Sequence, residues 1–455
     1  MVKIDLRPIT LPDFGVPLER PAIPPAVYVA RADEAYARAG ADWLVVYADR
    51  EHLANIAFLT GFEPRFEEAL LLLGRDHRRI LVTGNESQSY APLAGLPGIE
   101  IVVAQSMSLM GQDRTRFPNL ADVLREAGLG VGQTIGLIGW KYLSPEEWSG
   151  DRPTFQVPAF IVDTLAKVAG GHDSLKDETP VLMHPETGLR ASVDIHQIAQ
   201  GEWGAARASA AVWRIIAGSK PDVSEYEQVS RMGYAGEELN AHVMYASSSH
   251  GEPVVGLRSP SARPVRRGDG VATAVSYWGG LSARAGLFGE SDADFLSIAK
   301  AYFGGLLAWY EAVEIGVQGG TVFTAVTEAL SRDALRSALN PGHLVGHDEW
   351  VHTPIRPGST DRLLSGMPFQ VDIIPVPVPD GWALNCEDAV TLADETLRGD
   401  LAKHYPDVAG RIGARRRFMR EKLGVSLKDS ILPLSSTPLC LPPFWLASNQ
   451  LLCGS

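Results

Sequence analysis

The stretch GVATAVSYWGGLSARAGLFG, residues 270–289, is typical of a β-hairpin. Small and β-branched residues fill both halves, and the Gly279-Gly280 pair at the centre gives the backbone freedom that a tight turn needs. The stretch contains no Asp, Glu or His. We therefore predict two paired strands that contribute no carboxylate or imidazole of their own to a functional site.

The composition around this hairpin is that of a globular protein with more than one core. A chain of 455 residues is too long for one ordinary core and predicts at least two domains. Lys plus Arg number 41 against 54 Asp plus Glu, which gives a formal net charge of −13. This sign argues against nucleic acid or an anionic membrane surface as a main partner, because both favour basic patches.

Cysteine usage and hydropathy indicate the compartment. The three cysteines, Cys386, Cys440 and Cys453, show neither paired nor metal-ligand spacing. The N-terminus resembles no signal peptide, and no apolar run is as long as a membrane span. We expect a cytoplasmic protein without disulfide bonds.

Short apolar runs alternate with helical patterns in the first part of the chain. Their length, their leucine and β-branched residues and their glycine or charged borders are typical of strands. This alternation predicts a mixed α/β domain over residues 1–185. The expected strands are 42–48, 69–74, 79–84, 99–104 and 134–139.

The second part, residues 186–425, shows an internal duplication. A long helix is expected over 193–216, followed by a second helix that Ser224 opens and then by sheet segments. About ninety residues later, 295–315 and 321–335 repeat the helical pair. Such a duplication predicts two half-domains around a shared cleft.

The last segment, residues 426–455, is rich in proline and leucine. Four prolines interrupt its apolar run at 431–446, so it cannot form a helix. Because such a tail would be unfavourable in water, we expect it to pack on the body of the protein or on a partner subunit.

Three parts of the sequence resemble motifs of one superfamily. NIAFLTGF (55–62) is similar to a motif in the N-terminal domain of creatinases and prolidases, and PGHLVGHDEWVHTPI (341–355) to their glycine-flanked histidine motif. The pair GMPFQVDIIP (366–375) and NCEDAVTLAD (385–394) resembles their acidic strands. The chain therefore resembles the creatinase/aminopeptidase P superfamily. This implies an α/β (α+β) protein, with a creatinase-like mixed α/β domain followed by the duplicated pita-bread domain.

The resemblance also implies where metal ligands would lie. Metal-dependent members hold two ions with two aspartates, one histidine and two glutamates. His343 falls at the histidine, Asp372 at the first glutamate and Glu387 at the second. Because two neighbouring divalent ions need bridging carboxylates, we expect no dinuclear centre and no required cofactor, and leave a single divalent ion open. The aspartate positions fall, in either register, on Ala272 or Ala274 and on Ala283 or Ala285.

Creatinases work without metal, using an upstream histidine as acid and base. Here the matching position falls near Leu257-Arg258, so that pattern is also broken, unless His250 reaches the site along a different loop path. His343 or His347 is then the candidate acid and base, because a neutral imidazole can both accept and donate a proton.

The two acids lie in segments that otherwise read as buried strands, where an unpaired carboxylate is costly. We expect Asp372 and Glu387 to hold a cationic or amide nitrogen of a substrate, or to remain as a hydrogen-bonded relic. By strand alternation either Ala283 or Arg284 faces the cleft. The resemblance implies that the loop around Arg65 crosses a dimer interface. Candidate substrate-binding residues are Arg258, Arg284, Arg65, Phe62, His352 and Glu349.

These residues predict a creatinase-like, metal-independent hydrolase of a C–N bond in a small amino-acid-derived, guanidino or amide substrate. We expect a homodimer that binds neither nucleic acid nor membrane. Two alternatives stay open: a pita-bread protein that binds without catalysis, and a metal-dependent Xaa-Pro peptidase-like hydrolase or lyase with a reduced metal site.

Overall fold

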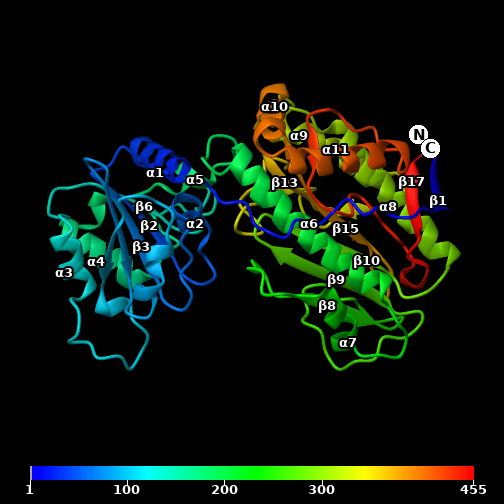
Figure 1. Ribbon diagram of the computed structural model, residues 1–455, viewed down its shortest axis with the longest axis horizontal. Coiled ribbons are helices and arrows are strands. Elements are labelled where there is room, and N and C mark those ends of the chain that lie inside the picture. The colour runs from blue at the N-terminus through cyan, green and yellow to red at the C-terminus, as the bar shows by residue number, and fades with distance from the viewer. Residues whose placement is uncertain (1–2, 455) are drawn as a thin grey trace. The chain divides into compact units, whose positions relative to one another are not determined.

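The computed structural model describes residues 3–454. Their contacts divide the chain into two compact units (Figure 1). Residues 22–191 form one unit, and the described residues on either side of this range form the other. The chain therefore begins in one unit, builds the second, and returns to the first.

The unit of residues 22–191 is a mixed α/β layer structure. Its six strands lie in the order β5-β4-β3-β2-β6-β7, in which β2 runs parallel to β6 and antiparallel to β3. The five strands expected from the sequence are confirmed, and the short β7 is an addition. The strands are β2 (Trp43–Ala48), β3 (Ala69–Gly74), β4 (Arg78–Thr83), β5 (Glu100–Val103), β6 (Ile135–Ile138) and β7 (Leu175–Asp177).

Helices complete the core of this unit. The side chains of β2 and β3 are buried along their whole length, because a sheet covered on both faces has no solvent side. Alternate side chains of β2 and β3 form one hydrophobic core with residues of α3 and α4. The helices are α1 (Pro25–Ala39), α2 (Ala54–Thr60), α3 (Leu120–Glu126), α4 (Ala159–Ala169) and α5 (Thr179–Met183).

The second unit is built on an antiparallel sheet. Its strands follow the path β12-β13-β15-β10-β9-β8, and β16 pairs with β15 as a branch. A separate short pair joins β11 (Arg336–Ser337) to β14 (Pro375–Val376). The strands of the large sheet are β8 (Met244–Ser248), β9 (Gly270–Tyr277), β10 (Gly280–Leu287), β12 (His343–Leu344), β13 (Pro368–Val371), β15 (Asn385–Leu392) and β16 (Ile431–Pro433).

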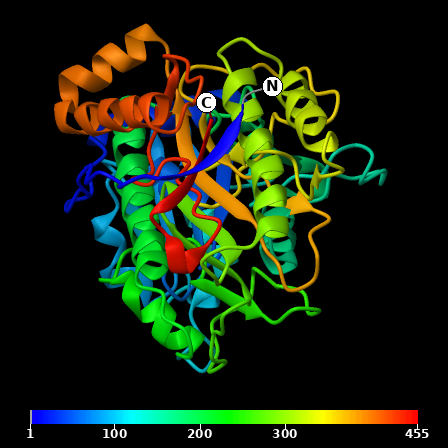
Figure 2. The same ribbon diagram turned by 90° about the vertical axis from the view of Figure 1, so that its right-hand side faces the viewer.

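The predicted duplication is present in the order of the elements. A long helix, α6, a short helix, α7, and the strands β8 to β10 form the first half; α8, α9 and the strands β12, β13 and β15 form the second. Figures 1 and 2 show α6 lying along the β9–β10 hairpin. The helices are α6 (Ile195–Ala217), α7 (Glu225–Val229), α8 (Ala293–Ala312), α9 (Gly319–Ser331), α10 (Glu395–His404) and α11 (Pro406–Glu421).

The hairpin has the form that its sequence predicts. Tyr277 pairs with Gly280, and Gly279 takes a left-handed φ of 98° that suits glycine. Its tip packs tightly on α6, since a Cβ added at Gly204 would lie 1.9 Å from the carbonyl oxygen of Trp278. Helix α6 can approach the sheet this closely because it presents glycine at the contact.

The C-terminal segment packs on its own unit, which confirms one of the two expectations for it. Nearly all side chains from 430 to 445 are buried, and the segment contains no α-helix. It ends in β17 (Gln450–Gly454), which pairs antiparallel with β1 (Ile4–Pro8) near the two ends of the chain (Figure 2).

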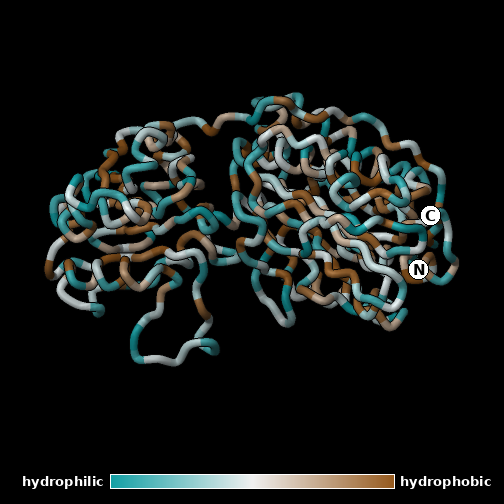
Figure 3. Tube along the Cα trace, turned by 90° about the horizontal axis from the view of Figure 1, so that it is seen from below, coloured by the Kyte–Doolittle hydropathy of each residue, from teal (hydrophilic) through white to brown (hydrophobic). Residues whose placement is uncertain are grey.

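The loops that project farthest are mainly hydrophilic or neutral in Figure 3. Within residues 3–454, no helix has the length and apolar character to cross a membrane.

Candidate functional site

The candidate site lies on one face of the large sheet. Directly paired residues of antiparallel strands share a face, and so do residues two apart on one strand. His343 pairs with Gln370, and Gln370 with Ala389, which is two residues from Glu387. The histidine, the glutamine and the glutamate therefore share one face of the sheet. Asp372, two residues after Gln370, lies on the same face.

A cross-strand row extends from Glu387 over the hairpin. Glu387 pairs with Ala283, Ala283 with Ala274, and Ala274 with Met244, across β15, β10, β9 and β8. Leu281, two residues before Ala283, joins the same cluster of buried apolar side chains. The face therefore changes from acidic to apolar between β15 and β10.

His343 is covered by the loop that follows its strand. Its Nδ1 lies 3.2 Å from the carbonyl oxygen of Leu344, and its Nε2 lies 3.0 Å from Oε1 of Glu349. The indole of Trp350 stacks on the imidazole with ring centroids 4.0 Å apart. Backbone hydrogen bonds from Leu344 to His352 and from Val351 to Leu344 turn the loop back over the ring.

The electrostatics of this imidazole follow from its surroundings. Burial alone would lower the pKa of His343, but the carboxylate of Glu349 and the charge of Asp372 together raise it above its ordinary value. The protonated ring forms an ion pair with Glu349 through Nε2, and its Nδ1 faces the carbonyl oxygen of Leu344. Glu349 therefore fixes the ring and stabilises its charged form.

The two buried acids are held in a poorly solvated place. Burial raises the pKa of Asp372 to about 6, and burial followed by repulsion from Asp372 and Glu349 raises the pKa of Glu387 well above its ordinary value. Gln370 Nε2 donates to Glu387 Oε1 at 3.0 Å. Asp372 Oδ1 is buried without a hydrogen-bond partner. The group therefore favours a proton or another cation among its carboxylates.

Three of these side chains could hold one metal ion. One ligand atom each from His343, Glu349 and Glu387 lie within 4.8 Å of one another. Ala274 and Ala283, which pair across the hairpin on this face, offer no side-chain ligand. The donor set suits at most one divalent ion with open coordination positions.

Arg284 is directed away from the site, which corrects the substrate-binding role expected for it. The residue next to it, Ala283, pairs with Glu387, so alternation turns the guanidinium to the opposite face. There it is fully buried and forms an ion pair with Asp388 at 2.8 Å. It also donates to the backbone carbonyls of Thr437 and Cys440. Arg284 neutralises Asp388 and not Asp372 or Glu387, and its role is structural.

Arg258 is also engaged elsewhere. Its guanidinium lies 2.6 Å from the buried carboxylate of Glu225, which accepts further hydrogen bonds from Ser247 and Ser261. This network joins β8 to the loop before β9. The predicted role of Arg258 in binding a substrate carboxylate has no support from this geometry. His250 is exposed in the loop after β8.

Phe62 and Arg65 belong to the unit of residues 22–191. Phe62 is buried with its ring 6.0 Å from that of Tyr90, so it is a core residue. Arg65 donates to the hydroxyl of Tyr90 at 2.8 Å and lies over its ring. Both side chains are explained within their own unit, and their substrate-binding role stays a prediction.

The other two histidines of the motif have different surroundings. His347 is buried and its ring meets the edge of Trp278, with centroids 4.9 Å apart. His352 Nδ1 accepts a hydrogen bond from the backbone N–H of Thr353 at 2.8 Å. His343 is brought against Glu349 and Glu387.

Two residues of the site were not expected from the sequence. Gln370 could have been found, because alternation along FQVD puts it on the face of Asp372. Trp350 gave no such signal, since its stacking depends on how the loop folds back.

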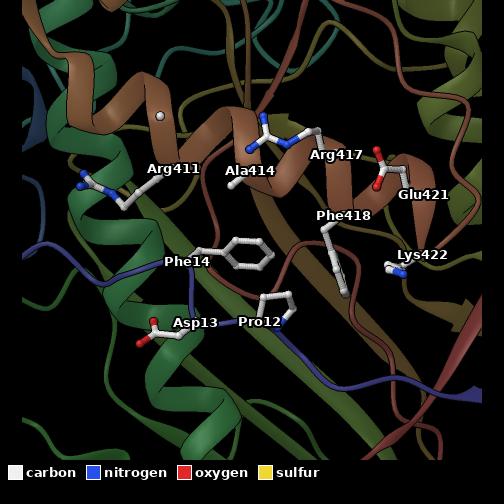
Figure 4. A pocket seen from close by; sticks show the side chains of 10 residues that line it. Pro12, Asp13, Phe14, Arg411, Ala414, Arg417, Phe418, Glu421 and Lys422 are labelled. Carbon is white, nitrogen blue, oxygen red and sulfur yellow. The ribbon is translucent and has the colours of Figure 1, made fainter.

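A cavity of about 470 Å³ lies between residues 12–14 and α11 (Figure 4). Its apolar lining includes Phe14 and Phe418, whose ring centroids are 5.6 Å apart. Its charged lining residues carry both signs, and Arg411 is already paired with Glu202. The cavity shares no lining residue with the candidate site.

Comparison with known proteins identifies the fold. No protein-family model and no curated protein sequence matches this chain. Among solved structures, dipeptidase PepE from Mycobacterium ulcerans matches with a TM-score of 0.60 and 20% identity, over 82% of this chain and 94% of that one.

Two further structures give the same result. The prolidase from Pyrococcus horikoshii matches with a TM-score of 0.63 and 14% identity, over 80% of this chain and 95% of its own. The X-Pro aminopeptidase from Thermotoga maritima matches with a TM-score of 0.61 and 14% identity, over 81% and 95%. The chain therefore has the pita-bread fold that these solved structures share, which confirms the fold expected from the sequence motifs.

Proposed function

We propose that the protein is a metal-independent hydrolase of a C–N bond in a small substrate with a cationic or amide nitrogen. The observation that carries this proposal is the convergence of His343, Glu349 and Glu387, with Asp372 on the same face of the sheet as His343 and Glu387, while Arg284 is turned to the other face. Buried carboxylates without a neighbouring Lys or Arg favour a cationic partner.

Each side chain has a defined task in this reaction. Glu387 and Asp372 bind the nitrogen side of the scissile bond and orient it. His343 Nε2 takes a proton from water as the water oxygen bonds to the substrate carbon, and then gives that proton to the leaving nitrogen as the C–N bond breaks. Glu349 stabilises the imidazolium between these steps. Gln370 keeps the carboxyl of Glu387 in place.

Turnover with variant enzymes tests the proposal. Guanidino acids and small amides are incubated with the wild type and with His343→Gln, and release of the amine is measured. We expect turnover that falls at least about a hundredfold in the variant, since general acid–base catalysis contributes about that much. Activity that His343→Gln leaves unchanged would contradict the assignment. Binding without any turnover would favour the binding protein instead.

A single-ion hydrolase or lyase is the second candidate. The close approach of ligand atoms from His343, Glu349 and Glu387 favours it. A divalent ion held by them would supply Lewis acidity at the scissile bond. Elemental analysis of protein purified without chelator, with thermal stability measured with and without EDTA, separates the candidates. A stoichiometric metal whose removal lowers stability would replace the metal-independent proposal.

A cytoplasmic homodimer is part of the same proposal. The net charge of −13 supports a small-molecule substrate over a polyanionic partner. Sedimentation equilibrium tests the oligomeric state, and a monomer at all concentrations would contradict the homodimer.

A further inference from the structure

The row of side chains beside Glu387 indicates more about the substrate of this site, and this step rests on the proposed function. Ala283, Ala274 and Met244 follow Glu387 across successive strands and share its face. Leu281 completes the apolar cluster. A carboxylate is thus placed directly next to a row of apolar side chains, and the polar Ser276, which pairs with Leu281, lies beside this row.

The apolar row is less completely covered than the opposite face of the same strands. Relative exposure is 8% for Ala274 and 9% for Met244, whereas Val271 and Val275 on the opposite face are at 0%. Those valines pack in the core that includes α6. In the adjacent row, Ala272 and Asn385 are partly exposed. The face of the site therefore borders solvent at Ala272 and Asn385.

The dimensions of a sheet set the size of the group that fits. Neighbouring strands lie about 4.8 Å apart, so Ala283 and Ala274 lie about 5 and 10 Å from Glu387 along the row. Alanine leaves a shallow floor, and the longer Met244 closes its far end. A chain of three or four carbons attached to a nitrogen at Glu387 would cover this floor.

We infer that the substrate carries a compact apolar group next to its cationic or amide nitrogen, and that Ala283, Ala274, Leu281 and Met244 bind this group. The acidic residues then recognise the nitrogen and the apolar row selects for alkyl substituents. Substrates that carry a second charge at this position are disfavoured, because the row has no polar partner for it.

Calorimetric titration with guanidine, ethylguanidine and n-butylguanidine tests this inference on the wild-type protein. We expect affinity to rise roughly fourfold for each methylene that is buried. The larger side chain in Ala283→Leu occupies the space above the alanine row. This variant should therefore show no rise in affinity with the length of the alkyl chain. Met244→Gln keeps the length of the side chain, and should weaken butylguanidine while leaving guanidine unchanged.

A matched control and the remaining outcomes keep the test decisive. Met232 is a similarly buried methionine of the other core, and Met232→Gln should not change the dependence on chain length. Equal affinity for all three guanidines would contradict the inference that the apolar row binds the alkyl group. It would not contradict the proposed hydrolase. No binding of any guanidine would contradict the cation site of the proposed function itself. Chain-length-dependent binding without turnover would support the inference and contradict the hydrolase.

Discussion

Ala283 and Arg284 are consecutive residues with opposite environments. Ala283 borders the candidate site, whereas the guanidinium of Arg284 is enclosed by Asp388 and by carbonyl groups of the C-terminal segment. Opposite charge and several acceptors offset the cost of burying this arginine. Its pKa stays raised because Asp388 outweighs the effect of burial.

Replacing this arginine tests its structural role. We expect Arg284→Met to lower the free energy of unfolding by about 3–5 kcal/mol, because Asp388 is left buried and unpaired. The double variant Arg284→Met with Asp388→Leu should recover a large part of that loss. Urea unfolding gives these values. Arg267→Met removes an exposed pair with Glu290 and should change stability by less than about 1 kcal/mol. A similarly small change for Arg284→Met would contradict the structural role.

Asp372 gives a prediction for pH dependence. Its pKa is raised to about 6 in the folded protein by burial, so ionisation opposes folding. The contribution of Asp372 to the stability of the wild type is therefore largest below the ordinary pKa of Asp. This contribution is lost as the pH rises from about 4 to 6.

The variant Asp372→Asn removes this dependence. The free energy of unfolding of Asp372→Asn minus that of the wild type should increase between pH 4 and pH 6 by at most about 1.4 kcal/mol per pH unit. Above pH 6 this difference should stay constant. Denaturant unfolding in the presence of EDTA at several pH values measures the difference. A difference that shrinks as pH rises would show that the folded protein favours the carboxylate.

At the level of elements, local signals in the sequence predicted most of the fold. Glycine at the turn and small residues on both sides specified the hairpin, and helical periodicity specified α6 and α8. Strands of two residues, such as β12, escape such patterns, because non-local pairing defines them. Alternation left the direction of Arg284 open between two faces, and only the pairing with β15 determines it. Stacking by Trp350 likewise depends on contacts that no spacing encodes.

The loop of residues 345–351 leads to a prediction about access to His343. Glu349 and Trp350 cover the imidazole, which is itself fully buried, while Trp350 is 39% exposed. Diethylpyrocarbonate should therefore modify His343 slowly. Trp350→Ala should raise this rate at least about tenfold, and Trp350→Phe, which keeps an aromatic ring in place, should raise it much less.

Peptide mass spectrometry after timed exposure measures this rate. The exposed His404 serves as an internal reference in every variant. Circular dichroism shows whether each variant is folded. Rapid modification of His343 in the wild type would mean that the loop is open in solution, and would contradict the contact with Trp350.

At the scale of the whole molecule, the chain order and the compact units do not coincide. Residues 22–191 possess a hydrophobic core built from their own strands and helices. The residues before them belong with the other unit, where the carbonyls of Pro17, Leu18 and Pro21 accept hydrogen bonds from side chains of α6. Strand β1 pairs with β17 in the same unit. The residues before 22 therefore contact both α6, near the start of this unit, and β17, at its end.

This arrangement predicts the behaviour of separated segments. The isolated segment 22–191 should unfold cooperatively, because a core of this size can fold alone. The segment 192–455 alone should be less stable than the same segment joined to residues 1–21 by a flexible linker, since it lacks the partner of β17 and the acceptors for α6. Unfolding by urea, followed by circular dichroism, compares the three proteins. Without β1, strand β17 keeps an unpaired edge, so the midpoint of unfolding of 192–455 alone should be lower. Equal stability of 192–455 with and without residues 1–21 would mean that β1 contributes nothing to the fold.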